Sequence, residues 1–177
     1  DFCTKFDLYK LGDWNSTIKM DEPGMPYHMD DERHTYIFMA LCVAQLQLHD
    51  IQPEPRLLTQ SRQALDFLTR RDGLLISGSC SLNEAWHDSQ TGSGNVSESC
   101  ATAYLTRLMD RLLRKTGEPR FGDLMERALY NGVPSGVSLD GQRFFYANPL
   151  AVYPAACRNA QEHVAAQRQE WFGCACC

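Results

Sequence analysis

The sequence predicts a mainly α fold that includes one small β-hairpin. Four segments carry apolar residues at steps of three and four positions, which places those residues on one face of a helix. A shorter stretch near the C-terminus instead shows two extended runs around an Asp-Gly turn. The chain has 177 residues, of which 44% are hydrophobic, so it can form one core or a part of a larger one.

The first two helices are predicted on either side of Pro55. The first runs from Arg33 to Leu48 with a single apolar stripe. The second begins at Pro55, because proline suits the first position of a helix, and its period stops at Arg70-Arg71-Asp72-Gly73. Residues 1–30 show no clear period, and we expect them to be irregular.

Two further helices are predicted in the second half of the chain. Asn95 is followed three residues later by Glu98, the spacing of a capping box, so a long amphipathic helix is expected from Asn95 to near Gly117. Pro119 opens the next helix, and Asn131-Gly132 closes it. Together with the first two, these segments predict four paired helices.

Two non-helical segments complete the predicted fold. The runs Val137 to Leu139 and Arg143 to Tyr146 flank Asp140-Gly141, which predicts a type I′ hairpin with a two-residue loop. Residues 77 to 94 are rich in Ser, Gly, Asn and Asp, and also contain ionisable and aromatic side chains. Polar loops of this composition commonly bind ligands.

Composition argues against several classes of function. The net charge is −5 and the isoelectric point is about 5.5, with no cluster of Lys and Arg, so nucleic-acid binding is not expected and a neutral ligand is favoured. No apolar run approaches the roughly 18 residues of a membrane helix. The first residues show neither the basic nor the apolar part of a signal peptide.

Eight cysteines could form a disulfide framework, but the sequence favours reduced thiols. Cys42 lies in an apolar helical stretch, and the adjacent Cys176 and Cys177 could pair only as a strained ring. Disulfide scaffolds are also short and loop-rich. Free thiols in turn favour a cytoplasmic location.

Four side chains suggest a zinc site. Glu98 and Cys100 stand two residues apart, and Cys176 and Cys177 end the chain, so three thiolates and a carboxylate could complete a tetrahedral Zn²⁺ shell. Two of these residues also have a purely structural alternative. Glu98 could close the capping box, and Cys100 could be a small buried hydrophobe.

Several motifs taken together resemble the β-L-arabinofuranosidase family, glycoside hydrolase family 127 and its relatives. The matching segments occur in the family's order and are Glu84-Ala85-Trp86-His87, Val96 to Thr102, Met125 to Gly132, Ser138 to Gly141, Phe144 to Leu150 and the terminal Cys-Ala-Cys-Cys. The resemblance covers residues 31–177 and implies part of an α/α toroid, the six-hairpin glycosidase-like barrel. We therefore expect residues 1–177 to be a partial catalytic domain, truncated at its zinc and nucleophile motif.

The resemblance also implies roles for particular residues. Glu98, Cys100, Cys176 and Cys177 would hold zinc, Cys176 would be the nucleophile, and Glu84 would be the acid/base. Asp30 stands where the family's sugar-binding motif has histidine, whereas the arginine and tyrosine of that motif are present. The residues implied to contact the sugar are Arg33, Tyr36, Trp86 and His87.

Two classes of function follow from these observations. The first is a retaining glycoside hydrolase that releases L-arabinofuranosyl or related sugars from an oligosaccharide or glycoside, although this partial barrel could be inactive alone. The second is a non-catalytic helical zinc module, in which the ligands only fasten the chain terminus to the helix after Asn95. Mutation of Glu84 would distinguish the two functions, because Glu84 lies outside the proposed zinc shell and should matter only for acid/base chemistry.

Overall fold

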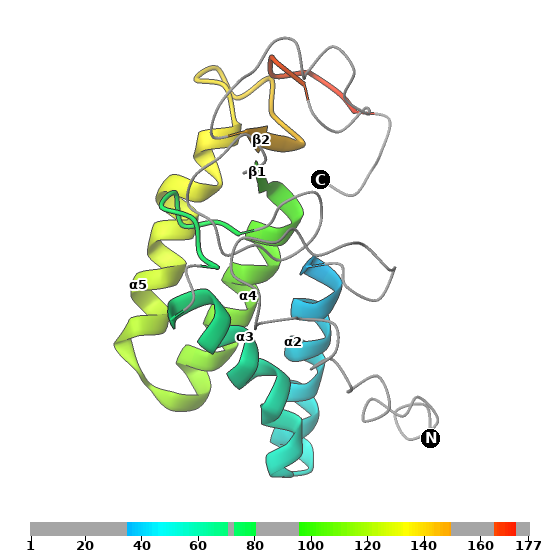
Figure 1. The fold of residues 1–177 in the computed structure, drawn as a ribbon, viewed down its shortest axis with the longest axis vertical. Helices are drawn as coiled ribbons and strands as arrows, with labels where there is room; N and C mark the ends of the chain where they lie inside the picture. The colour runs from blue at the N-terminus through cyan, green and yellow to red at the C-terminus, as the bar shows by residue number, and fades with distance from the viewer. Residues whose placement is uncertain (1–34, 71–72, 81–95, 150–164, 173–177) are drawn as a thin grey trace.

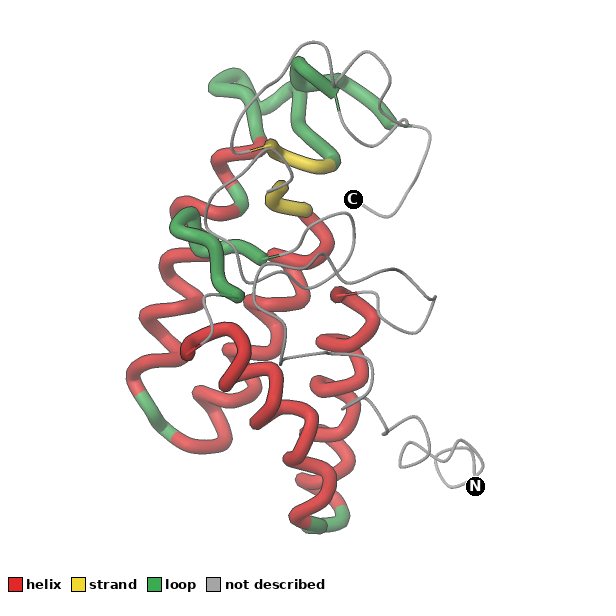
Figure 2. The backbone as a smooth tube through the Cα atoms, viewed as in Figure 1, coloured by secondary structure: helices red, strands yellow, loops and turns green. Residues whose placement is uncertain are grey.

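The computed structural model describes residues 35–70, 73–80, 96–149 and 165–172, which form a helical layer with a small sheet at one end (Figure 1). Figure 2 shows the helices grouped together, with the strands and most of the loops beyond the start of α4. The helical elements are α2 (Thr35–Ile51), η2 (Pro55–Leu58), α3 (Thr59–Arg70), α4 (Ser99–Thr116), α5 (Pro119–Arg127), η3 (Ala128–Gly132) and η4 (Pro134–Gly136). The strands are β1 (Val96–Glu98) and β2 (Ala147–Pro149).

The helix α4 is the centre of the core. It packs against α2 on one side and α5 on the other, while α3 returns along α2. Its buried apolar residues recur along one face, as the sequence predicted, and are Cys100, Ala101, Leu105, Leu108, Met109 and Leu112. Burying one such leucine side chain stabilises the fold by about 1.5–3 kcal/mol. The apolar stripe of α4 is therefore what holds the neighbouring helices together.

The predicted helix boundaries at proline and glycine are confirmed. Pro55 begins the 3₁₀ turn η2 that leads directly into α3, and Pro119 is the first residue of α5. Gly117 ends α4 in the left-handed conformation, with φ of 71° and its N–H donating to the Leu113 carbonyl. Glycine adopts this φ at little steric cost, so the chain can turn sharply into α5.

The predicted capping box at Asn95 is wrong. Residues Val96–Glu98 form β1, which pairs antiparallel with β2, and α4 begins only at Ser99. Glu98 is the N-cap residue, with extended backbone (φ −92°, ψ 135°) and no side-chain capping hydrogen bond. The reason is non-local: the backbone of Glu98 is opposite Ala147, and this pairing keeps the segment extended.

The predicted two-residue hairpin loop is also wrong, although the two runs do pair. Val137 and Phe144 form an antiparallel bridge, and Ser138 N–H donates to the Arg143 carbonyl (2.8 Å). The loop therefore has four residues, 139–142. Gly141 N–H donates to the Ser138 carbonyl (2.8 Å), and the Asp140 carboxylate accepts hydrogen bonds from Ser138 Oγ and Gln142 N–H, which stabilise this longer turn.

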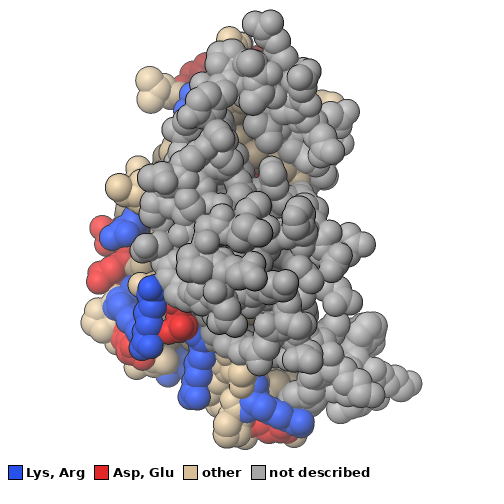
Figure 3. Space-filling view, viewed as in Figure 1, with Lys and Arg blue, Asp and Glu red and all other residues tan. Residues whose placement is uncertain are grey.

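Charges of both signs share the described surface in Figure 3. Ion pairs within or beside helices include those of Arg70 with Asp66, Arg114 with Asp110, and Arg120 with Glu118. No helix within the described ranges is long and apolar enough to cross a membrane.

Candidate active site

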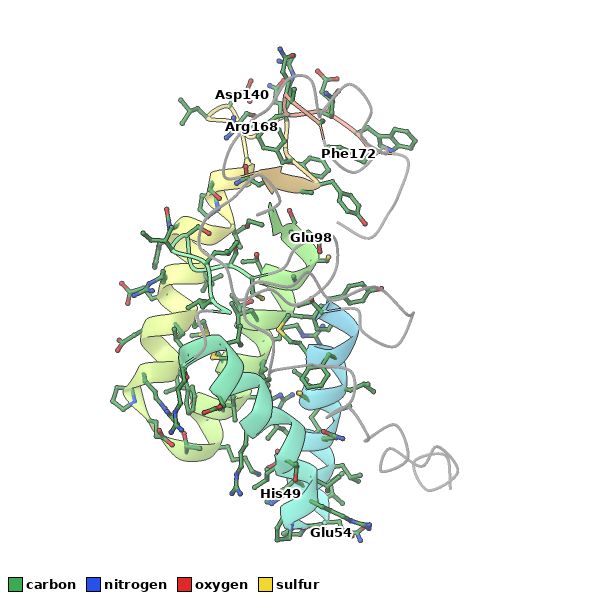
Figure 4. All side chains as sticks on the ribbon, in the orientation of Figure 1. His49, Glu54, Glu98, Asp140, Arg168 and Phe172 are labelled. Atoms are coloured by element: carbon green, nitrogen blue, oxygen red, sulfur yellow. The ribbon has the colours of Figure 1, made fainter. Side chains whose placement is uncertain are left out.

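The described residues that matter for the site gather at one end of the helical layer. Figure 4 shows Glu98 at the start of α4, with Arg168 and Phe172 beyond the sheet on the same end, whereas His49 and Glu54 lie at the opposite end. Two chain segments that are distant in sequence reach this end: the loop 73–80 and the C-terminal segment 165–172.

Glu98 is a carboxylate that the fold buries almost completely, with 2% of its surface exposed. Its backbone pairs with Ala147, and its carbonyl accepts a hydrogen bond from Thr102 Oγ1 (2.8 Å) one turn into α4. The position of Glu98 is thus fixed from both sides. A buried carboxylate is stable only when hydrogen bonds, a proton or a cation compensates its charge.

Cys100 lies two residues after Glu98, as the second residue of α4, and its side chain is buried. Zinc binds both cysteine sulfur and glutamate oxygen. The two buried donors at the start of α4 therefore fit the predicted metal.

The structure places a second buried thiol, that of Cys80, within electrostatic reach of Glu98, and the sequence did not predict it. Cys80 is fully buried, and burial raises the pKa of its thiol far above the usual value, with a further increase from the negative charge of Glu98. The neighbouring residues on both sides are hydrogen-bonded to each other, because Ser79 Oγ donates to Ser97 Oγ (2.5 Å). No spacing in the sequence relates Cys80 to Glu98, since the loop 73–80 reaches β1 only in the folded chain.

The motif Met125 to Gly132 holds the loop 73–80 in place. Asn131 Nδ2 donates to the Ser77 carbonyl (2.8 Å). Gly78, with φ of 87°, lies so close to Arg127 that an added Cβ would be 2.6 Å from Arg127 Cγ, and an added Cβ at Gly132 would be 3.3 Å from the Gly78 carbonyl oxygen. Two glycines thus allow the backbones of the loop and of η3 to touch.

Tyr36 is the predicted sugar-binding residue that the structure describes. It lies in the first turn of α2, and its ring packs on that of Tyr104, with 5.5 Å between the ring centroids. Tyr104 is four residues after Cys100, so both lie on the same face of α4. The packing brings Tyr36 to the Cys100 side of α4, while its contact with sugar stays a prediction.

The other predicted site residues lie outside the described residues. They are the sugar-contacting Arg33, Trp86 and His87, the acid/base Glu84, and the ligands Cys176 and Cys177. Of the four predicted zinc ligands, Glu98 and Cys100 are thus described. Within the described part of the chain, no three His, Cys, Asp or Glu side chains are close enough to hold a metal ion.

Two cavities lie elsewhere along the helices. One, of about 330 Å³, is lined by residues of α2, α4 and α5, including Asp110 and Met125. The other, of about 230 Å³, includes Leu65 and Phe121 in its lining. Neither is lined by Glu98 or Cys100, so we assign neither to the site at the start of α4.

Residues 27–177 match the model of the β-L-arabinofuranosidase GH127 catalytic domain. Over 81 residues, the chain is 36% identical to the non-reducing end β-L-arabinofuranosidase of Bifidobacterium longum subsp. longum, a match that covers 45% of this chain and 12% of that protein. The match therefore spans only a small part of that relative's length.

The chain is also similar in fold to solved structures of this family. The crystal structure of a GH127 β-L-arabinofuranosidase from Geobacillus stearothermophilus T6 aligns with a TM-score of 0.70 and 32% identity, over 81% of this chain and 23% of that one. The structure of a second GH127 β-arabinofuranosidase aligns with a TM-score of 0.68 and 28% identity, over 81% of this chain and 22% of that one. The described helices are thus part of an α/α toroid, and the chain spans less than a quarter of these relatives.

Proposed function

The chain belongs to the GH127 β-L-arabinofuranosidase catalytic-domain family, and on that premise we propose that its protein is a retaining glycoside hydrolase. Its substrate would be an oligosaccharide or glycoside that ends in an L-arabinofuranosyl or related residue. Cys176 would be the nucleophile and Glu84 the acid/base. The structural observation that supports this proposal best is the burial of Glu98 and Cys100 together at the start of α4.

Glu98, Cys100, Cys176 and Cys177 would hold zinc in this protein. Bound zinc would keep the cysteine sulfurs ionised at neutral pH, which a free thiol with a pKa of about 8.5 does only in small part. The start of α4 supplies one buried carboxylate and one buried thiol of this set. The segment that ends at residue 172 leads directly to the other two.

The reaction would then proceed in two displacements at the anomeric carbon. In the first, the Cys176 sulfur forms a bond to that carbon while the bond to the leaving oxygen breaks, and Glu84 gives its proton to that oxygen. In the second, Glu84 takes a proton from water, the water oxygen attacks the anomeric carbon, and the bond to sulfur breaks. Two inversions leave the configuration of the sugar unchanged.

Zinc content and turnover of the full-length protein test this proposal. The substrate is p-nitrophenyl β-L-arabinofuranoside, and the variants are Cys176→Ser and Glu84→Gln. We expect Cys176→Ser to be inactive and Glu84→Gln to keep its zinc but lose about 10²–10⁴-fold in rate, the usual contribution of a general acid/base. A wild-type protein with zinc but no turnover on any pentofuranoside would instead favour the non-catalytic zinc module.

A further inference from the structure

The C-terminal segment 165–172 adds a third extended segment to the ribbon that begins at Val137. Phe144 N–H donates to the Gln169 carbonyl, and Gln169 N–H donates to the Phe144 carbonyl, both at 2.9 Å. Phe144 is therefore bridged to Val137 on one side and to Gln169 on the other. This reciprocal pair fixes the register of the segment that leads to the terminal cysteines.

Arg168 fixes the same segment through three interactions, two with η4 and one with the Phe145 ring. Its Nη2 donates to the Ser135 carbonyl (2.9 Å), and its Nε donates to the Gly136 carbonyl (3.2 Å). Its guanidinium carbon also lies 4.9 Å from the centroid of the Phe145 ring. A planar guanidinium that donates two hydrogen bonds and stacks on a ring allows few orientations.

Phe172 is the second attachment point. Its ring is buried, with its centroid 5.0 Å from that of Phe144 and 5.8 Å from that of Tyr146. Cys176 follows four residues later. A chain spans at most about 3.3–3.6 Å per residue, so the Cα of Cys176 lies within roughly 14 Å of that of Phe172.

The run of residues that receives this segment leads directly into β2, which pairs with Glu98 of β1. Ser99 N–H donates to the Tyr146 carbonyl (3.4 Å), Ser99 Oγ donates to the Phe145 carbonyl (3.2 Å), and Glu98 is opposite Ala147. Residues 144–147 therefore contact the C-terminal segment through the side chains of Phe145 and Tyr146 and through Phe144, and they contact the start of α4 through the Phe145 and Tyr146 carbonyls and through Ala147. One short strand links the two halves of the proposed ligand set.

We propose that Arg168 is a positioning residue, which fixes the approach of the terminal cysteines to Glu98 and Cys100. The proposal rests on the function proposed above, because it assigns to Arg168 the placement of the Cys176 nucleophile. Arg168 touches neither the sugar nor the reacting atoms in this role. It acts through the backbone of residues 169–172, which it holds against η4 and the Phe145 ring.

The experiment compares Arg168→Gln with Arg120→Gln in the full-length protein. Arg120 is a matched control, because its guanidinium also lies over a phenylalanine ring, 4.7 Å from the Phe121 centroid, but at the start of α5. The measurements are kcat and KM on p-nitrophenyl β-L-arabinofuranoside and the rate at which zinc passes to a chromogenic chelator. Arg168→Lys is included because it keeps the charge and can donate one of the two hydrogen bonds.

We expect Arg168→Gln to lower kcat by about 10–100-fold with little change in KM, since a misplacement of about 1 Å costs on that order. Zinc should also leave faster, with Arg168→Lys intermediate and Arg120→Gln unchanged. If Arg168→Gln and Arg168→Lys match Arg120→Gln in kcat and zinc release while the wild type is active, the positioning role is wrong and the proposed function stands. A wild type without zinc and without turnover would overturn both.

Discussion

Glu98 and Ala147 lie opposite each other in the antiparallel sheet, so the backbone of one proposed zinc ligand is fixed by a strand 49 positions away. The neighbouring Tyr146 contacts Phe172, beyond which the chain leads to the other proposed ligands. The sheet is small, but it is the structural element that relates two distant parts of the sequence. The site therefore depends on strand pairing as much as on the helices.

Glu98→Gln should remove zinc while leaving the fold intact. The two side chains have nearly the same shape, but the neutral amide cannot replace a carboxylate ligand. Loss of a residue that only hydrogen-bonds to a metal ligand lowers metal affinity by roughly 10–100-fold. Because Glu98 would itself be a ligand, we expect zinc affinity to fall by more than that. Zinc content after dialysis against a weak chelator measures this. Glu126→Gln, at an exposed site, is the control, and equal zinc in both variants would remove Glu98 from the ligand set.

Gly78→Ala should destabilise the protein strongly. The new Cβ would overlap Arg127, and residue 78 has φ of 87°, which strains any residue other than glycine. The overlap and the strain together should lower the free energy of unfolding by about 2–4 kcal/mol. Gly141→Ala is the matched control, because Gly141 has φ of 71° with no atom within 4 Å of an added Cβ. It should cost about 1 kcal/mol. Denaturant unfolding compares them, and equal losses would contradict the close contact.

Asp50 should contribute to stability at neutral pH but not in strong acid. Its carboxylate accepts a hydrogen bond from Lys115 Nζ (2.6 Å), which holds the pKa of Asp50 below its usual value of 3.8. A lowered folded-state pKa stabilises the fold above the unfolded value, and this contribution is lost as pH falls through the folded value. Asp50→Asn should therefore lower Tm at pH 7, and the difference from wild type should shrink below pH 3.8. A difference independent of pH would contradict the ion pair.

Cys42 should resist alkylation in the folded protein. Burial raises the pKa of its thiol to about 12, so almost no thiolate exists at neutral pH, and the side chain is also inaccessible. Treatment with iodoacetamide, followed by peptide mass spectrometry, should label Cys42 only after denaturant is added. Labelling of native protein at the rate of a model thiol would show that α2 does not pack on the core as described.

Local signals predicted the helices well. The apolar period of α4 matches its buried face, and Pro55, Gly117 and Pro119 mark real boundaries, because helix periodicity and backbone restrictions act within a few residues. The described Cys42 and Cys80 are buried thiols that form no disulfide, in agreement with the reduced cysteines that the sequence favoured. These features depend on the residue and its near neighbours alone.

Non-local contacts account for what the sequence did not predict. The segment before α4 looked like a capping box, but its pairing with Ala147 makes it a strand. The burial of Cys80 near Glu98 follows from the position of the loop 73–80, which Asn131 and Gly132 of η3 hold in place. Neither contact has a short-range signal. The family resemblance supplied the roles of Glu84, Cys176 and Cys177, which stay predictions.

The most direct test of the account is the mass of the protein during turnover. Glu84→Gln, mixed with an aryl β-L-arabinofuranoside that has a good leaving group, should form the first sugar–enzyme bond readily but release it slowly, because the general base is missing. Acid quenching, proteolysis and mass spectrometry should then find one pentosyl group on Cys176. A pentosyl group on a carboxylate, or undiminished turnover in Cys176→Ser, would contradict the cysteine nucleophile and with it the central claim.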